Sequence, residues 1–206
     1  MSNAVAAARD SGSFHFVDKE GSGSQSVVLT GDTGTVTAQE ISTTAAGRLA
    51  VSLVDGVAFL QAGAATLESF LGLSTTVATR MSGKWVSVTK GEKGYTRIVQ
   101  SLAPHAEFDA YIPQIGLSVG KQTTLHRIAV LPVSGTAPAR DSTTGLPAVA
   151  TLFVSLRAPY LPVGGVVSGN DIHGRRQSEE VVFTKWGEQP HLSAPPGAVS
   201  LASLTS

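Results

Sequence analysis

Apolar and polar residues alternate with a period of two through much of residues 13–61, which is typical of β-strands with one buried face. Leu49, Val51 and Leu53 recur at every second position, and residues 27–30 form a short β-branched run. Turn-forming residues separate these runs at short intervals. We therefore predict a meander of antiparallel strands, because a parallel sheet would need helices between its strands.

The dipeptide Asp55-Gly56 separates two apolar runs at residues 48–54 and 57–61. A type I′ turn requires positive φ at both of its central residues, and Asp-Gly meets that requirement at low cost. The sequence therefore predicts a tight hairpin at this position. Further turn signals stand at residues 32–34 and 46–47.

The spacing of apolar residues then changes from two to three and four. Leu67, Phe70 and Leu71 lie on one stripe of a helix, and Gly72 follows them. Glycine directly after such a stripe favours a helix end, because it adopts the left-handed conformation without a steric penalty. We predict a short helix that ends before Gly72.

Shorter helical segments flank this region. Ser74 is a suitable N-cap for a second helix over residues 77–81, and the pattern at residues 95–103 predicts a third helix. Between them, residues 84–88 have the composition of a strand. Near the start of the chain, residues 5–10 are alanine-rich and predict a short helix.

Strand-like composition returns after residue 117. We predict strands at residues 123–133, 149–156 and 179–186, joined by loops rich in glycine and proline. Residues 134–147 have the most loop-like composition.

These elements predict an α+β fold, in which helices cover the concave face of a strongly curved antiparallel sheet, or half-barrel. We expect a single domain over residues 5–200. Residues 1–4 resemble an expression-vector remnant, and residues 201–206 are predicted to form a disordered tail.

A curved sheet covered by a few short helices is expected to leave a cavity. Short helices cannot fill a concave face to native density, and an empty apolar void of roughly 500 Å³ would cost on the order of 12 kcal/mol. That cost is comparable to the whole stability of a domain. An acyl chain would fill such a space without needing a polar partner, so the pattern favours a lipid guest.

Composition excludes several functions. Charged residues make up 15% of the chain and the formal net charge is zero, so nucleic acid is not expected as a partner. Cysteine is absent, which excludes disulfides, thiolate nucleophiles and thiolate metal ligands within this sequence. No apolar run approaches the roughly 18 residues needed to span a bilayer.

Two segments resemble the LppX/LprG-type lipoproteins of mycobacteria and other actinobacteria. Residues 83–88 (GKWVSV), preceded by residues 70–74 (FLGLS), resemble a segment of that group, and residues 181–187 (VVFTKWG), followed by residues 194–199 (APPGAV), resemble its closing strands and tail. The order matches over nearly the whole chain.

The resemblance implies an open half-barrel similar to the carriers of the Lol lipoprotein pathway. It further implies binding of a lipid, glycolipid or lipoprotein acyl chain, and no enzymatic activity or cofactor. It also implies export to the cell envelope, on the outer face of the plasma membrane. The lipidated cysteine of the family is missing here, so a native N-terminal lipid anchor is expected upstream of this sequence.

Two polar clusters are candidate ion sites. His105, Glu107 and Asp109 offer metal ligands, but their spacing matches no common zinc or calcium motif, so we interpret them as a surface loop. Four further residues are a candidate anion site, but we interpret them as a solvated hairpin tip: Asp171, His173, Arg175 and Arg176. The pair Gly164-Gly165 lacks the lysine of a phosphate loop, and no G-x-S-x-G nucleophile elbow occurs.

The predicted ligand wall consists of apolar strand and helix residues, with no catalytic or metal-binding residue. These are Val51, Leu53, Phe59, Leu67, Phe70, Leu71, Val77, Ile98, Val99, Leu102, Ile128, Val130, Leu152, Val154, Val181 and Phe183. Our first hypothesis is a lipid carrier in which mobile helices admit the guest. The alternative is an interaction or sensor domain of the same fold that binds an envelope protein without carrying lipid.

Overall fold

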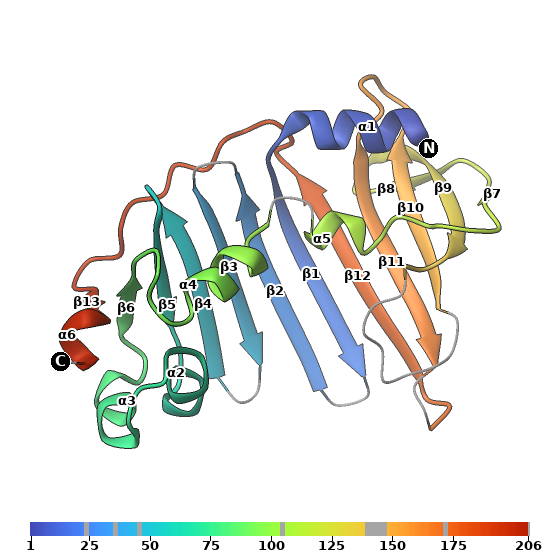
Figure 1. Ribbon diagram of the computed structural model, residues 1–206. Helices are drawn as coiled ribbons and strands as arrows, with labels where there is room; N and C mark the ends of the chain where they lie inside the picture. The colour runs from blue at the N-terminus through green and yellow to red at the C-terminus, as the bar shows by residue number, and fades with distance from the viewer. Residues whose placement is uncertain are drawn as a thin grey trace.

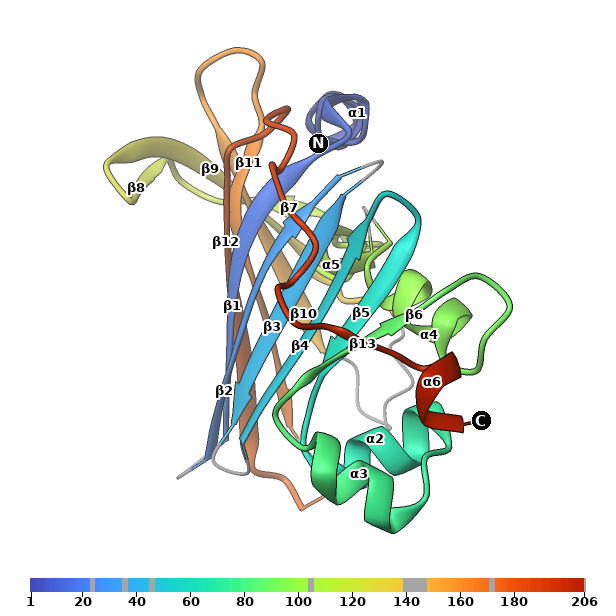
Figure 2. The same ribbon diagram turned by 90° about the vertical axis from the view of Figure 1, so that its left-hand side faces the viewer.

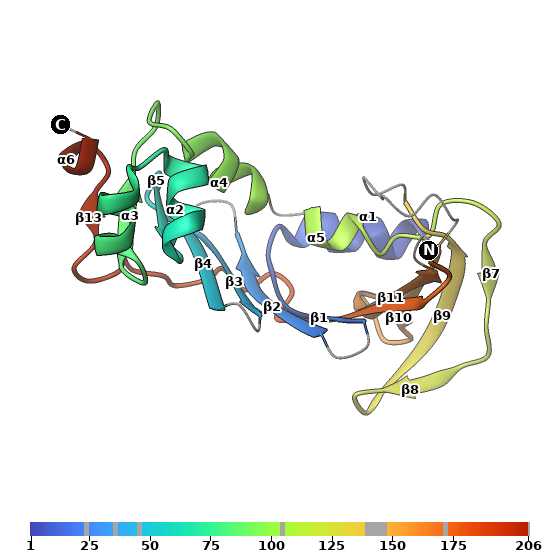
Figure 3. The same cartoon turned by 90° about the horizontal axis from the view of Figure 1, so that it is seen from below.

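A single curled sheet runs across the molecule, with short helices on its inner side (Figure 1; Figure 3). The computed structural model describes residues 1–22, 25–34, 37–44, 47–103, 106–138, 148–170 and 173–205. Figure 2 shows that the sheet twists strongly along its length, as expected from the right-handed twist of each strand. The predicted α+β class, with helices on the concave face of an antiparallel half-barrel, is confirmed.

The strands are β1 (Phe14–Ser22), β2 (Gln25–Thr33), β3 (Ala38–Thr44), β4 (Gly47–Val54), β5 (Val57–Gln61), β6 (Trp85–Val88), β7 (Ser118–Val119), β8 (Thr123–Leu125), β9 (Ile128–Thr136), β10 (Val149–Ser155), β11 (Pro162–Asn170), β12 (Arg176–Thr184) and β13 (Val199–Ser200). The helices are α1 (Ser2–Ser11), α2 (Ala64–Leu71), α3 (Thr75–Met81), α4 (Tyr95–Ser101), α5 (Ala106–Asp109) and α6 (Ala202–Thr205).

The strand order is β13-β6-β5-β4-β3-β2-β1-β12-β11-β10-β9-β7, and β8 also pairs with β9. Neighbouring strands are antiparallel except for β13 and β6, which run parallel. The first six strands lie in sequence order, as the predicted meander requires. The pairing of β1 with β12 joins the two halves of the chain at the middle of the sheet.

The hairpin predicted at Asp55-Gly56 is present. Asp55 has φ 49° and Gly56 has φ 78°, which are the positive values that this turn needs. The turn expected at residues 32–34 begins later than predicted, because Asp32 and Thr33 still belong to β2. Ala46, in the third turn signal, lies outside the described residues.

The helix signals in the middle of the chain are confirmed. Gly72 ends α2 in the left-handed conformation, and its N–H donates to the carbonyl of Glu68 at 2.9 Å. The Ser74 side chain caps α3 by accepting a hydrogen bond from the Val77 N–H at 3.5 Å. The predicted helix near residue 100 corresponds to α4.

Strand β11 is not predicted by the sequence. Pro162 and the pair Gly164-Gly165 normally weaken strands, so this segment has the composition of a loop. Gly165 is required by packing: a Cβ at this position would lie 2.8–3.0 Å from atoms of the Tyr111 side chain. The glycines therefore mark places where neighbouring elements approach closely.

The segment from residue 123 to residue 138 also differs from the prediction. His126 and Arg127 both adopt positive φ and break the predicted single strand into the hairpin β8–β9. Residues 134–136, expected in a loop, continue β9 and pair with β10. Residues 139–147 of that expected loop lie outside the described residues.

The prediction of a disordered end is wrong for residues 201–205. Leu201 is only 3% exposed, and its N–H donates to the carbonyl of Ser87 at 2.9 Å. The following residues form α6. Isolated leucines in a small, polar tail are thus enough to dock the end of the chain beside β6.

Two separate apolar cores stabilise the two ends of the concave face. The first core packs α2, α3 and α4 against β4, β5 and β6, with Leu60, Leu67 and Ile98 fully buried at its centre. The second core packs α1 and the α5 region against β1 and β12. The strip of sheet between these cores is the floor of the site described below.

Candidate functional site

A cavity of about 630 Å³ lies on the concave face between the two cores. Its floor comes from β1, β2, β3, β4 and β12, and α5 borders it. The lining residues are acidic or small and apolar for the most part: Asp18, Glu20, Val27, Leu29, Glu40, Ser42, Leu49, Glu107, Asp109, Ala110, Pro138 and Glu179. The cavity is therefore amphipathic, whereas the sequence predicted an apolar one.

Strand alternation places the acidic residues of β1 in the cavity. Phe14 and Phe16 are buried on the concave face, so Asp18 and Glu20, at the next even positions, point to the same side. In the register between β1 and β12, Glu20 lies opposite Glu179. Like charges face each other across this pair, an arrangement that is unfavourable unless protons or a cation compensate it.

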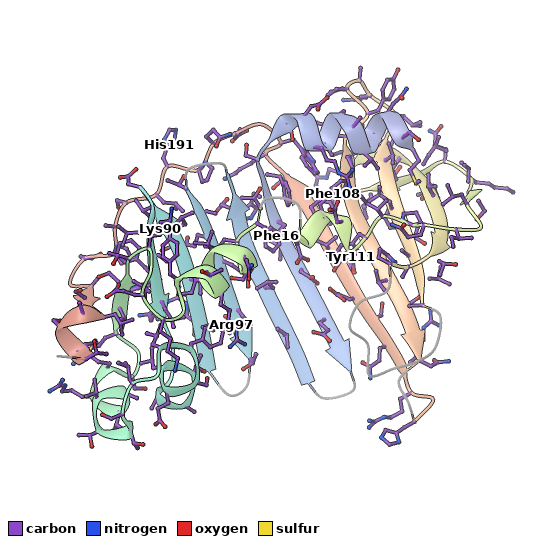
Figure 4. All side chains as sticks on the ribbon, viewed as in Figure 1. Phe16, Lys90, Arg97, Phe108, Tyr111 and His191 are labelled. Atoms are coloured by element: carbon purple, nitrogen blue, oxygen red, sulfur yellow. The ribbon has the colours of Figure 1, made fainter. Side chains whose placement is uncertain are left out.

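Helix α5 brings a further carboxylate, Glu107, to this floor. The neighbouring Phe108 is fully buried, and its ring lies edge-on to Phe183 and Trp186 with both centroid distances at 5.7 Å. This aromatic anchor fixes the helix over the sheet, where Figure 4 shows Phe108 and Tyr111 over the central strands. The surface-loop interpretation is therefore wrong for Glu107, while His105 lies outside the described residues.

Asp18, Glu107 and Glu179 form a compact group that we call the acid cluster. One oxygen from each carboxyl lies within 4.8 Å of the others. The Tyr111 hydroxyl lies 2.7 Å from Asp18 Oδ2 and 2.9 Å from Glu179 Oε1. Because one hydroxyl proton cannot occupy both contacts at once, the second contact requires a proton on a carboxyl group.

Burial and like charges raise the pKa values of groups around the cluster. Burial is the largest cause for Asp18, followed by its contact with the carboxyl of Glu107, and together they raise its pKa to about 9. Burial and then the charge of Glu107 raise the pKa of Glu40 to about 7. The pKa of Tyr111 is also raised, first by burial and then by the charge of Asp18, so its hydroxyl keeps its proton.

The raised pKa values predict that stability falls as pH rises. The folded protein holds protons that the unfolded chain releases above its ordinary carboxyl pKa, so the free energy of unfolding should decrease between pH 3.8 and about pH 9. A decrease of about 2 kcal/mol in the free energy of unfolding lowers the melting temperature of a chain of this size by about 4–8 °C. We expect melting curves to show a drop of this size in melting temperature from about pH 5 to about pH 8.5.

Replacing Asp18 with asparagine should flatten this pH dependence, because the amide has nearly the same shape and does not ionise. Glu180→Gln is the matched control, since Glu180 is exposed and adjacent to Glu179 on the other face of β12. Equal pH dependence in the wild type and Asp18→Asn would show that Asp18 titrates normally.

The predicted ligand-wall residues lie mainly in the two cores. Those buried in or packed against the first core are Val51, Leu53, Leu67, Phe70, Leu71, Val77, Ile98 and Leu102. Those in or against the second are Leu152, Val154, Val181 and Phe183. Elsewhere, Phe59 and Val130 are buried, Val99 is half-buried and Ile128 is 38% exposed.

None of these residues lines the 630 Å³ cavity, although Leu102 borders a smaller one of about 40 Å³. Their role in ligand contact stays a prediction. None of the residues that line the cavity was predicted to contact a ligand, although Glu107 and Asp109 had been considered as metal ligands and one further signal was available. Asp18 follows Phe14 and Phe16 at the same period of two, which indicates a carboxyl group on the buried face of a strand.

The other polar clusters lie elsewhere. Asp109 borders the cavity and forms an ion pair with Arg9 of α1 at 2.9 Å, with both side chains about half exposed. His173, Arg175 and Arg176 are exposed where β11 turns into β12, the placement expected for a solvated hairpin tip. Asp171 lies outside the described residues.

Comparison with solved structures identifies the architecture. Lipoprotein LppX of Mycobacterium tuberculosis superposes with a TM-score of 0.59 at 12% sequence identity, covering 93% of this chain and 95% of LppX. The chain has the LppX fold. LprF of Mycobacterium bovis shares that fold with a TM-score of 0.54 at 12% identity, covering 95% of this chain and 96% of LprF.

The LppX fold thus confirms, at the level of architecture, the resemblance found in the sequence. Identities this low show the fold alone, so the ligand must be argued from the cavity of this chain. No protein-family model matches the sequence, and no curated protein matches it. Among the described residues, no helix combines the length and hydrophobicity needed to cross a bilayer.

Proposed function

We propose that this protein binds and carries an amphipathic lipid in the cavity on the concave face of its half-barrel. The observation that carries the proposal is the 630 Å³ cavity between the two cores. Its size falls within the range of about 300–1,000 Å³ that is usual for small-molecule sites. Its lining provides separate apolar and acidic regions, which suit the two parts of such a ligand.

The apolar part of the lining suits an acyl chain. Val27 and Leu29 lie on β2 and Leu49 lies on β4, with Ser42 of β3 between Leu29 and Leu49. Ala110 and Pro138 also line the cavity. Each methylene group removed from water against such side chains contributes about 0.8 kcal/mol. The cavity opens to solvent on one side, as shown by its border residues: Glu20 is exposed and Asp109 is about half exposed. A long chain can therefore extend beyond it.

The acidic part of the lining suits a polar but uncharged head group. With its raised pKa, Asp18 holds a proton near neutral pH, and Glu40, whose pKa is about 7, is about half protonated there. A protonated carboxyl group donates one hydrogen bond and accepts others, so it can pair with ester or hydroxyl oxygens of a lipid. Its neutral state also avoids placing a bare charge beside the hydrocarbon.

We further propose that the protein acts in the cell envelope and is held at the membrane by a lipid anchor upstream of this sequence. The named neighbour of the same fold, LppX, is a lipoprotein, which supports this placement. The carrier role requires binding and release without covalent chemistry. Hence we assign the protein no enzymatic activity.

The test is direct detection of the guest. Purified protein is extracted with organic solvent and the extract is analysed by mass spectrometry, and delipidated protein is titrated with a fluorescent fatty acid. We expect a lipid in near-stoichiometric amount and saturable uptake of the probe. A lipid-free extract together with no uptake would exclude the carrier function.

A second candidate is binding of an envelope protein without lipid. It is favoured by exposed apolar side chains near the β7 edge of the sheet, where Ile115 is 73% exposed and Val119 is 67% exposed. Edge strands with apolar side chains commonly pair with other chains. This candidate predicts that delipidated wild-type protein binds an envelope partner, that Val119→Lys abolishes this binding, and that the wild type takes up no fatty acid. Together these results would favour it over the carrier function.

A further inference from the structure

We propose that the β7 edge of the sheet docks on an anionic membrane surface through residues 115–128, which we call the rim segment. This segment contains β7 and β8 and forms the edge of the sheet at the end opposite β13 (Figure 1; Figure 3). Every residue from 114 to 124 is exposed. The proposal goes beyond the carrier function, because docking on a membrane needs no guest in the cavity.

Exposed apolar side chains are concentrated at this end of the sheet. Ile115 is 73% exposed and Val119 is 67% exposed. Single exposed apolar residues are ordinary, whereas a group of them at one place indicates an interaction surface. Of the eight large apolar side chains that are exposed among the described residues, six lie on β7–β10 or in the adjoining loops: Ile115, Leu117, Val119, Ile128, Val149 and Tyr160.

The same end of the sheet carries positive charge. From residue 110 to residue 170 the sequence contains four lysine or arginine residues and one acidic residue, although the formal net charge of the chain is zero. That acidic residue, Asp141, lies outside the described residues. The described cations are Lys121, Arg127 and Arg157, and all three are exposed. Charge is therefore segregated along the chain, with its positive part on this edge.

Backbone pairing brings the loop after β10 beside the rim segment. The Leu156 N–H donates to the Ala129 carbonyl at 3.0 Å, so Arg157 lies next to the β8–β9 hairpin that contains Arg127. Figure 2 shows this hairpin projecting from the body of the sheet. Cations are attracted to anionic head groups, and apolar side chains, with the ring of Tyr160, are stabilised in the interfacial layer. This combination fits an anionic lipid surface.

A lipid surface fits this edge better than an added protein strand does. Strand addition uses a row of free backbone groups. Here β7 has two residues and β8 has three, and Gly116 bends the chain before β7 with φ 67°. Lys121 stands between the two strands, and lysine on an edge is a common protection against strand pairing. The edge therefore presents side chains to a partner, with little regular backbone.

A second cavity lies between the rim segment and the proposed lipid site. Its volume is about 520 Å³, and it shares Asp109 and Pro138 with the 630 Å³ cavity. It is also lined by Ile112 and Gln114, and Gln114 directly precedes the rim segment. Under the proposed carrier function, on which this step rests, lipid can pass from a docked bilayer through this space to the cavity floor.

The experiment measures cosedimentation of this chain with vesicles of phosphatidylcholine alone and with vesicles that also contain about one third phosphatidylglycerol. We expect binding to the anionic vesicles to be at least about tenfold tighter, because each lysine or arginine near such a surface strengthens binding about fivefold. Binding should weaken at about 0.5 M salt, which screens these charges. Lys121→Glu and Val119→Glu should each weaken it at least about tenfold.

Lys84→Glu and Val28→Glu are the matched controls, because they make the same changes at exposed positions away from this edge. Lys84 directly precedes β6, and Val28 lies on β2. Each control should bind anionic vesicles within about threefold of the wild type. A second measurement uses an environment-sensitive dye on Leu117→Cys, which reports one site because the sequence has no cysteine. Its emission should shift to the blue on anionic vesicles, whereas the same dye on Val28→Cys should not respond.

The proposal is overturned by no vesicle binding, by equal binding to the two kinds of vesicle, or by equal weakening in the controls. Self-association or binding of an envelope protein that Val119→Glu abolishes, without vesicle binding, would assign the rim segment to that partner instead. Thermal melts establish that every variant is folded. Fatty-acid uptake by Lys121→Glu should match the wild type, because Lys121 lines neither cavity. The carrier function and the docking surface can therefore fail separately.

Discussion

Replacing Phe183 with alanine should lower the free energy of unfolding by about 3–5 kcal/mol, the usual cost of deleting a buried aromatic ring. Phe183 is 2% exposed on β12, and its ring contacts those of Phe14, Phe108 and Trp186 at centroid distances of 5.5–5.7 Å. The cavity left in the second core would loosen α5. Urea denaturation followed by tryptophan fluorescence measures the change directly.

Val182→Ala provides the comparison, because Val182 neighbours Phe183 but is half-buried on the other face of the strand. Its loss should cost about 1 kcal/mol or less. Similar costs for the two variants would mean that the aromatic cluster does not anchor the fold. Phe183→Ala should also reduce lipid uptake, since Glu107 and Tyr111 depend on the same anchor for their positions.

Replacing Ser42 with tryptophan should reduce fatty-acid affinity at least about tenfold. Ser42 lies on the cavity floor, where its neighbours in the register are Leu29 and Leu49. An indole ring at this position would displace at least two methylene groups of an acyl chain, which is worth about 1.6 kcal/mol. Titration with a fluorescent fatty acid gives the affinity.

The matched control is Thr43→Trp, because Thr43 is the next residue on β3 and its exposed side chain points away from the cavity. This variant carries the same bulk and should bind the probe as the wild type does. If both tryptophan variants bind equally well, the lipid does not occupy the concave cavity. Circular dichroism spectra should confirm that both variants keep the fold.

The elements set by local chemistry were predictable from the sequence. The Asp55-Gly56 turn, the glycine that ends α2 and the Ser74 cap each depend on a few adjacent residues. A short stretch of sequence is therefore enough to predict each of them. The meander follows from period-two alternation between short turns. The curled α+β architecture then follows from the proportion of strands to short helices.

The elements set by distant contacts were not predictable in the same way. Strand β11 forms despite Pro162 and Gly164-Gly165, because glycine leaves room for the ring of Tyr111 more than fifty residues earlier in the chain. The C-terminal helix is ordered because Leu201 docks beside β6. In both cases the deciding neighbour is remote in sequence, so local composition suggested a loop.

The acidic side of the candidate site was missed for a related reason. Apolar strand residues suggested an oily cavity, but most of them fill the two cores and leave the strip between the cores to carboxyl groups. Asp18, Glu107 and Glu179 are separated widely along the chain. Only the pairing of β1 with β12 and the docking of α5 bring them together.

The central claim is that an acyl chain lies on the floor between the two cores. Photocrosslinking with a diazirine-bearing fatty acid, followed by peptide mass spectrometry, tests it most directly. We expect labels on peptides that contain Leu29, Leu49 and Ala110, and Ser42→Trp should suppress them. Labels confined to the outer face of the sheet, or to helices α2–α4 with none on the cavity floor, would contradict the account.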